Sequence, residues 1–121
     1  MRVLLADDQP EVRSALRLLL EQEPGLTVVA EVAEALELSA LVKETCPDMV
    51  LLDWELPGQP SADILLTLRS FCPSMTVVVL SVRPEARSAA LLAGADAFVS
   101  KGDPPEQLLV TVRDCLSGEK M

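Results

Sequence analysis

The sequence predicts an α/β domain in which helices cover both faces of one parallel sheet. Short runs rich in valine and leucine alternate with helical patterns five times along the 121 residues. Such alternation favours parallel strands joined by right-handed crossovers, and continuously apolar runs are typical of strands buried on both faces. No linker, repeat or low-complexity tract divides the series. We therefore expect one domain over residues 1–121 that ends at about residue 117, before the start of a linker or tail.

The five predicted strands are short apolar runs that turn or charged residues separate from the segments around them. They cover residues 2–6, 27–30, 49–52, 76–80 and 97–99. The second strand follows the turn Pro24-Gly25, and the third runs directly into Asp53. The fifth is the shortest of the set, so its assignment depends most on its place in the alternation.

The five predicted helices carry apolar residues at helical spacing and are bounded by residues that start or stop helices. They cover residues 11–21, 34–45, 61–71, 84–93 and 104–116. Pro10 suits the first turn of the first helix. Pro47 and Pro73 stand just beyond the second and third helices, and Gly94 is placed to end the fourth, which is rich in alanine.

Polar side chains follow four of the predicted strands. Asp7 and Asp8 follow the first, Asp53 the third, Ser81 the fourth and Lys101 the fifth. The carboxyl ends of parallel strands share one edge of the sheet, and open α/β sheets bind ligands at that edge. In the flavodoxin-like doubly wound order 2-1-3-4-5, the first and third strands are neighbours. The three carboxylates should therefore converge, with a hydroxyl and an ammonium beside them.

Three adjacent carboxylates repel one another unless a positive charge joins them. Mg²⁺ is the natural partner, because it takes oxygen ligands and commonly uses one or two carboxylates together with a phosphate. A site with Mg²⁺, a lysine and an accessible carboxylate has the parts for phosphoryl transfer to that carboxylate. We identify Asp53 as the expected nucleophile and Ser81 as a donor to a phosphoryl oxygen.

The motifs LLADDQP, PDMVLLD, LSVR and AFVSK, in this order, resemble the receiver domain of bacterial two-component response regulators. The resemblance covers essentially the whole chain. The segments EPGLTVVAEVAEA and LLAGADAFVSKGD are most similar to receivers of regulators that carry a LuxR/NarL-type helix-turn-helix. By resemblance, this chain would be a phosphoacceptor that assists its own phosphorylation and dephosphorylation, rather than an enzyme.

The resemblance implies a role for each site residue. Asp53 would be the phosphoacceptor, and Mg²⁺ would be held by Asp7, Asp8, Asp53 and the main-chain carbonyl of Glu55. Lys101 would bind the phosphoryl group. The remaining implied role is a switch pair: Ser81 and Phe98. A phenylalanine in a short strand is usually a core residue, so only the resemblance assigns Phe98 to the switch.

The resemblance also implies partners. A sensor histidine kinase would donate the phosphoryl group, and the surface over residues 84–116 would change its affinity for a partner, with a homodimer through this surface as one candidate. The alanine-rich helix in this surface is equally compatible with ordinary close packing. A DNA-binding output domain would belong to the full-length protein.

Four positions depart from the family pattern. Trp54 places a bulky ring after the acceptor, where it could pack in the core or cover the site. Glu55 puts a negative charge beside the phosphoryl route. The loop at residues 59–61 lacks a common glycine and with it an easy positive φ, so we expect a different backbone path. Gly102 replaces a proline that is common after the lysine, and a cis bond there would cost more without it.

Composition excludes several classes. The formal charge is −9, which disfavours direct nucleic-acid binding, and the absence of histidine excludes histidine-based catalysis. No apolar run is long enough for a membrane span, and the N-terminus lacks a signal-peptide pattern, so we expect a cytoplasmic protein. For the three cysteines, Cys46, Cys72 and Cys115, we expect reduced and mostly buried thiols.

Two other functional classes remain open. A flavodoxin-like protein that binds flavin or nucleotide would share the fold, but the first loop is acidic and lacks the G-x-G-x-x-G and P-loop patterns. A stand-alone or pseudo-receiver would act through protein contact alone. The presence of every reactive group favours the phosphoacceptor over both.

Overall fold

All five predicted strands form, and they pair in parallel in the order β2-β1-β3-β4-β5. The computed structural model describes residues 1–117. The expected linker or tail after about residue 117 lies outside these described residues. In chain order the strands are β1 Arg2–Ala6, β2 Thr27–Val32, β3 Met49–Asp53, β4 Thr76–Ser81 and β5 Ala97–Ser100. This confirms the flavodoxin-like doubly wound architecture.

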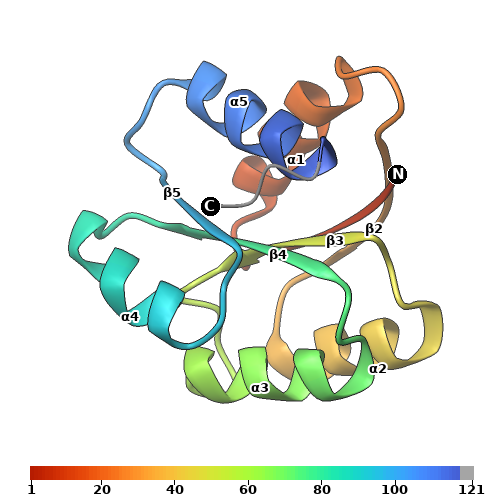
Figure 1. Cartoon of the computed structure of the whole chain (residues 1–121), viewed down its shortest axis with the longest axis vertical. Helices are drawn as coiled ribbons and strands as arrows, with labels where there is room; N and C mark the ends of the chain where they lie inside the picture. Colours follow the sequence, from red (N-terminus) through yellow and green to blue (C-terminus); the bar gives the residue numbers. More distant parts are fainter. Residues whose placement is uncertain (118–121) are drawn as a thin grey trace.

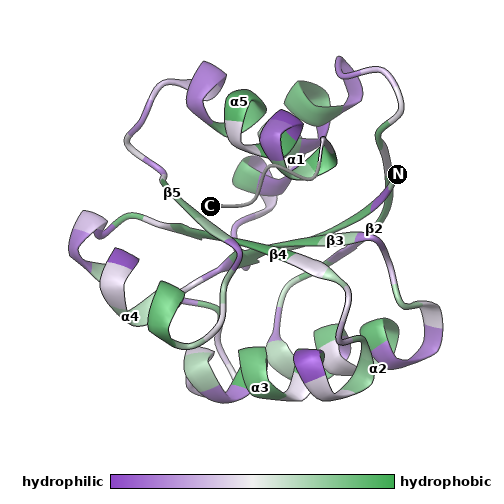
Figure 2. Ribbon diagram, viewed as in Figure 1, coloured by the Kyte–Doolittle hydropathy of each residue, from purple (hydrophilic) through white to green (hydrophobic). Residues whose placement is uncertain are grey.

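Two layers of helices enclose the sheet (Figure 1): α1 and α5 on one face, α2, α3 and α4 on the other. Their bounds are α1 Pro10–Glu21, α2 Ala35–Thr45, α3 Ser61–Phe71, α4 Arg87–Leu92 and α5 Pro105–Leu116. In Figure 2 the strands are mostly hydrophobic, and each helix mixes hydrophobic and hydrophilic residues. Each layer thus turns an apolar side to the sheet, and the alternating side chains of β1 and β3 divide between two hydrophobic clusters.

Burial of β3 and β4 is complete: every residue of both strands is buried. This is the pattern expected of central strands covered on both faces. Their register pairs Asp53 with Leu80, and the register of β1 with β3 pairs Ala6 with Leu52. The last residue of β3 therefore lies level with the residue that follows β1.

Four of the five helix starts differ from the expected ones. α1 begins one residue earlier, at Pro10, and α5 begins one residue later, at Pro105. The fourth predicted helix begins as a 3₁₀ turn, Pro84–Ala86, before α4 proper. Glu34 is the N-cap of α2 rather than its first residue, because its carboxylate accepts hydrogen bonds from the backbone N–H groups of Leu36 and Glu37. Gly94 follows α4 with φ +109°, as a C-terminal stop requires.

The loop between β3 and α3 turns at Gly58, which has φ +115°. None of residues 59–61 has a positive φ, in line with the missing glycine there. The Cβ of an alanine at position 58 would lie 3.0 Å from the Cβ of Ala35, and the amide of Ala35 donates to the carbonyl of Pro57 at 3.0 Å. No peptide bond among the described residues is cis, including the one that follows Lys101.

The expectation of three reduced and mostly buried cysteines is wrong for two of them. Cys46 and Cys72 form a disulfide, with their Cα atoms 5.9 Å apart, and Cys46 is exposed. Each is the C-cap of its helix, α2 and α3 respectively, and these helix ends meet. Cys115 is buried in α5 and is not part of the disulfide.

Within residues 1–117, none of the helices combines the length and the apolar character that crossing a membrane requires.

Candidate functional site

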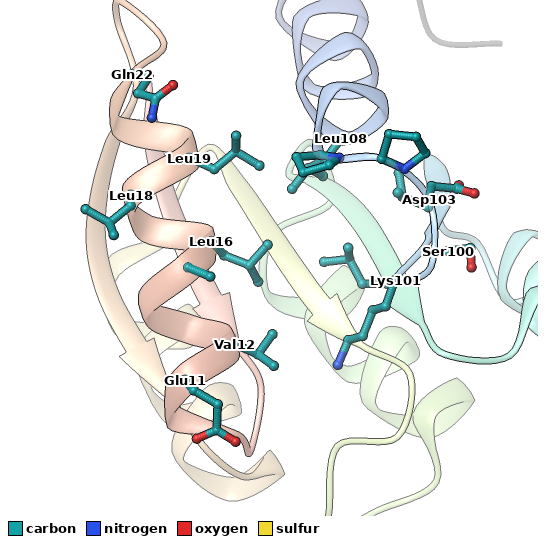
Figure 3. Close-up of a pocket in the computed structure, with 15 residues that line it drawn as sticks. Glu11, Val12, Leu16, Leu18, Leu19, Gln22, Ser100, Lys101, Asp103 and Leu108 are labelled. Atoms are coloured by element: carbon teal, nitrogen blue, oxygen red, sulfur yellow. The ribbon is translucent and has the colours of Figure 1, made fainter.

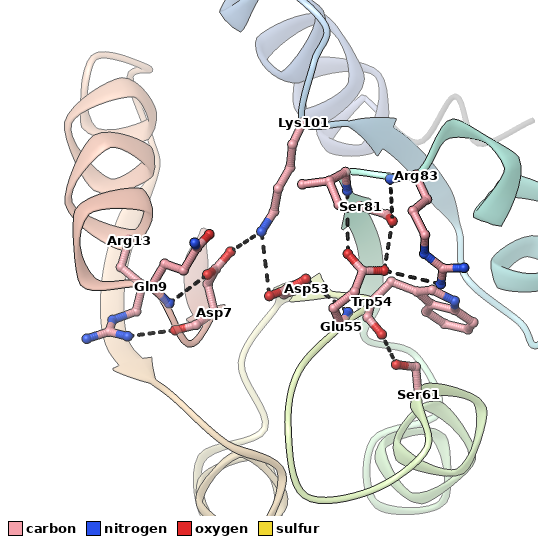
Figure 4. Close-up of polar contacts among 11 residues, drawn as sticks. Asp7, Gln9, Arg13, Asp53, Trp54, Glu55, Ser61, Ser81, Arg83 and Lys101 are labelled. Carbon is pink, nitrogen blue, oxygen red and sulfur yellow. Dashed lines mark hydrogen bonds and ion pairs between the residues drawn. The ribbon is translucent and has the colours of Figure 1, made fainter.

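The three predicted carboxylates meet at the carboxyl edge of the sheet: each of Asp7, Asp8 and Asp53 offers a carboxylate oxygen within 4.8 Å of the others. Figure 4 shows two of them, Asp7 and Asp53, on either side of the Lys101 ammonium. Asp7 and Asp53 are almost fully buried, with 1% and 2% of their surface exposed, whereas Asp8 is exposed. Adjacent β1 and β3 create this cluster, since one ends just before Asp7 and the other ends on Asp53. The arrangement is a set of oxygen ligands that could hold a hard divalent cation.

Lys101 points into the same cluster from the loop after β5. Its Nζ lies 2.7 Å from Oδ2 of Asp7 and 3.5 Å from Oδ2 of Asp53. The backbone fixes its origin, because the amide of Lys101 donates to the carbonyl of Ser81 at 2.8 Å. Four of the residues predicted from the sequence are therefore brought together here.

Backbone donors hold the two buried carboxylates in place. The amide of Glu55 donates to Oδ1 of Asp53 at 3.0 Å, and the amide of Gln9 donates to Oδ1 of Asp7 at 2.9 Å. Arg13 adds a charged donor, with Nη1 2.6 Å from the carbonyl oxygen of Asp7. Each carboxylate keeps its other oxygen toward Lys101, so the acids are oriented before any ligand arrives.

Burial raises the pKa of Asp53 to about 6. The hydrogen bond from Glu55 and the charge of Lys101 oppose this rise, while the negative charges of Asp7 and Glu55 add to it. For Lys101, burial disfavours the charged form, but the hydrogen bond to Asp7 and the charges of Asp53 and Asp7 outweigh it, so its pKa is raised. The site therefore combines a charged ammonium with a buried carboxyl, that of Asp53, whose pKa favours ionisation only above mildly acidic pH.

Ser81 faces Glu55 instead of the acidic cluster. Its hydroxyl donates to Oε2 of Glu55 at 2.8 Å and accepts from the amide of Arg83 at 3.0 Å. Nη2 of Arg83 also lies 3.4 Å from Oε2 of Glu55. The sequence analysis missed Arg83. Its place two residues after Ser81, which ends the strand next to the one that precedes Glu55, was the available signal that it could pair with Glu55. Figure 4 shows this contact.

Phe98 and Trp54 both pack with the hydrophobic cluster that lies between the sheet and helices α2, α3 and α4. Phe98 has only 7% of its surface exposed and pairs in register with Val79. Trp54 is partly buried against the same cluster, and its amide donates to the carbonyl of Leu80 at 2.8 Å. Of the two positions considered for Trp54, packing against the core is the one observed.

An apolar pocket of about 580 Å³ opens beside the site, between α1 and the segment that joins β5 to α5 (Figure 3). Val12, Leu16 and Leu19 line it from α1, and Leu108 lines it from α5. Lys101 also lines this pocket. The pocket thus adjoins the acidic cluster through a shared residue.

Comparison with known proteins identifies the family. The family described as response regulator receiver domain matches residues 3–113, which is nearly the whole chain. The chain belongs to the response regulator receiver domain family. Among curated relatives, the nitrate/nitrite response regulator protein NarL of Escherichia coli K12 is 34% identical over 119 residues, which are 97% of this chain and 55% of that protein. The receiver domain described here thus spans about half the length of such relatives.

Solved structures of receivers agree with this membership. A LuxR-family two-component response regulator from Aurantimonas sp. SI85-9A1 has a TM-score of 0.90 and 34% identity, covering 98% of this chain and 86% of that one. The receiver domain of the putative response regulator NarL from Mycobacterium tuberculosis has a TM-score of 0.86 and 29% identity, covering 97% and 96%. This receiver domain is therefore related to those of NarL- and LuxR-type regulators.

Proposed function

We propose that Asp53 accepts a phosphoryl group from the phosphohistidine of a partner kinase. A carboxylate oxygen of Asp53 attacks phosphorus, and the bond from phosphorus to the imidazole nitrogen breaks. The observation that carries the proposal is the convergence of Asp7, Asp8 and Asp53 with the ammonium of Lys101 at one sheet edge. The domain is not an enzyme in this scheme, although its own residues assist its phosphorylation and dephosphorylation.

We propose Mg²⁺ as the cofactor, held by Asp7, Asp8, Asp53 and the main-chain carbonyl of Glu55. The donor set supports it, because oxygen-only ligands with a high negative charge suit a hard divalent cation. When bound, Mg²⁺ supplies the positive charge that offsets phosphoryl oxygens during transfer. The ion would also favour the ionised form of Asp53, which is the nucleophilic form.

Lys101 and Ser81 would contact the phosphoryl group. Lys101 needs little movement, because Nζ is already 3.5 Å from Oδ2 of Asp53. Ser81 must exchange its hydrogen bond to Glu55 for one to a phosphoryl oxygen. The phosphoryl group shifts the equilibrium only by the difference between its contacts in the two arrangements, and this exchange supplies such a difference.

We propose that the signal leaves through the surface over residues 84–116. Ser81 is the last residue of β4, and only residues 82 and 83 separate it from the 3₁₀ turn that leads into α4, so a shift at Ser81 would reach this surface first. Phe98, on the neighbouring strand β5, would change its side-chain position in step. The partners would be a second copy of the chain through this surface and, in the full-length protein, a LuxR-type DNA-binding output domain that controls transcription in the cytoplasm.

The kinase would approach beside the acceptor. The apolar pocket between α1 and α5 supports this, because Lys101 belongs both to the pocket and to the acidic cluster. A helix carrying the phosphohistidine and seated against Leu16 and Leu19 would bring its imidazole toward Asp53. The net charge of −9 argues against this chain contacting nucleic acid by itself.

Intact mass spectrometry tests the assignment. The chain is incubated with Mg²⁺ and acetyl phosphate, with a matched sample in EDTA. We expect the mass of one phosphoryl group to be added only when Mg²⁺ is present, and no addition to Asp53→Asn. No gain in the parent chain, or an equal gain in Asp53→Asn, would refute the proposal and favour a pseudo-receiver that acts through contact alone.

A further inference from the structure

The disulfide joins two helix ends far from the acidic cluster. Helices α2 and α3 lie side by side in the layer below the sheet (Figure 1). Cys46 is the C-cap of α2 and Cys72 is the C-cap of α3, and their sulfur atoms are bonded across 26 positions of sequence. Neither residue contributes to the proposed phosphoryl transfer.

Cys46 occupies a backbone position that does not favour cysteine. Its φ is +43° and its ψ is +67°, in the left-handed region. It is the only residue other than glycine with a positive φ in the described part of the chain. Glycine is the usual residue at such helix ends, because any β-carbon is disfavoured there. The backbone therefore does not explain the cysteine, whereas the bond to Cys72 does.

The two bonded cysteines differ in their exposure to solvent. Cys46 is exposed, whereas Cys72 has only 4% of its surface exposed and belongs to the hydrophobic cluster between the sheet and helices α2, α3 and α4. Thiol–disulfide exchange begins with a thiolate that reaches one of the two sulfurs. Because Cys46 is the exposed residue of the pair, an external thiol should attack at Cys46, and the sulfur of the buried Cys72 would then be the leaving group.

We propose that Cys46 and Cys72 are a reversible modification site, which exchanges with a low-molecular-weight thiol of the glutathione class. In reduction, the external thiolate attacks the sulfur of Cys46, the Cys46–Cys72 bond breaks, and the Cys72 thiolate takes up a proton. A second external thiol releases Cys46 from the mixed disulfide. Two electrons and two protons pass to the protein, and the external pair leaves as its disulfide. Oxidation is the reverse exchange.

The bridge restrains the helical layer that packs against the loop after Asp53. The C-terminal ends of α2 and α3 are joined by the disulfide, and the N-terminal end of α2 meets the loop through Ala35 and Pro57. The disulfide closes a loop of 26 positions between Cys46 and Cys72, and such a closed loop lowers the entropy of the unfolded chain. The oxidised domain should therefore melt at a temperature higher by about 10 °C. This inference holds whether or not Asp53 is the phosphoacceptor.

The test counts thiols at defined redox poise. The 121-residue chain is equilibrated in its native state with reduced or oxidised glutathione, quenched, unfolded and alkylated, and its mass is measured. We expect two fewer alkyl groups per chain in oxidised glutathione, full recovery of both after return to reduced glutathione, and the higher melting temperature in the oxidised sample.

Two variants provide controls. Cys46→Gly places the residue that the left-handed position favours, so its fold should be retained, and Cys72→Ala removes the buried sulfur. We expect the number of alkyl groups and the melting temperature of both variants to be independent of redox poise, apart from a glutathione adduct at the remaining cysteine. Equal alkylation of the parent chain in reduced and oxidised glutathione would overturn the proposal, as would failure of the native chain to recover both thiols in reduced glutathione. It would also be overturned if the parent chain accumulated only the mixed disulfide with glutathione, or if Cys46→Gly lost two thiols in oxidised glutathione.

Discussion

Replacing Asp53 with asparagine should stabilise the metal-free domain at neutral pH. The buried carboxyl has a pKa of about 6 in the folded chain, against an ordinary value of 3.8. The folded state therefore binds the proton more tightly than the unfolded state, and folding stability falls as pH rises from the unfolded value through the folded one. Asparagine has nearly the same shape and no charge, so it removes this penalty.

The magnitude follows from the two pKa values. A difference between 3.8 and about 6, at about 1.4 kcal/mol per pH unit, makes the ionised carboxylate cost on the order of 3 kcal/mol once the pH is well above 6. At about pH 4.5, where the carboxyl is mostly protonated in the folded state, the same relation gives a cost of only about 1 kcal/mol. For a domain of this size, the increase in melting temperature of Asp53→Asn should be about 10 °C at about pH 7.5 and a third of that at about pH 4.5.

The assay is thermal unfolding in EDTA, with parent and variant compared at each pH so that other titrations cancel. Asp8→Asn is the matched control, because Asp8 belongs to the same cluster but is exposed and should change the melting temperature little. An equal increment for Asp53→Asn at both pH values, or a decrease at neutral pH, would contradict the argument that burial of the charge is costly. Added Mg²⁺ should stabilise the parent and have much less effect on Asp53→Asn.

Three other predictions concern separate parts of the structure. Gly58→Ala should lower the free energy of unfolding by about 2 kcal/mol or more, because the new Cβ would lie 3.0 Å from the Cβ of Ala35. Gly25→Ala is the control: Gly25 has a similar φ of +88° but no atom within 4 Å of an added Cβ, so this variant should lose only about 1 kcal/mol. Equal urea midpoints for the two variants would show that the contact with Ala35 has no effect. Glu34→Ala removes the N-cap of α2 and should cost about 1 kcal/mol, measured in the same way. Glu55→Gln should change the decay rate of phosphorylated protein, because the acid holds Ser81; an unchanged rate means that its charge has no role there.

The sheet and the acidic cluster could be predicted because one topological rule fixes them together. Continuous apolar runs located the strands, and the doubly wound order made the strands before Asp7 and Asp53 neighbours. The polar residues that end those strands must then share an edge. Lys101 follows from the same rule, since β5 is parallel to the others.

What the sequence could not predict depends on contacts between elements. The bond between Cys46 and Cys72 requires α2 and α3 to end at the same place, and spacing along the chain says nothing about that. The partner of Ser81 is a choice among nearby acceptors, and side-chain packing decides it in favour of Glu55. The cap at Glu34 was not predictable either, because serine, threonine, aspartate and asparagine favour the N-cap position, whereas glutamate is typical of the first turn of a helix.

The contact between Asp7 and Lys101 joins residues 94 positions apart, and this separation has a consequence for how the domain folds. Lys101 follows β5, which pairs only with β4 at the border of the sheet. Until β5 pairs with β4, the carboxylates of Asp7 and Asp53 lie close together without the ammonium group of Lys101. During synthesis from the N-terminus, the acidic cluster therefore receives its lysine only when the sheet itself is complete. If Asp53 accepts a phosphoryl group as proposed, competence to do so would then report that the sheet is complete.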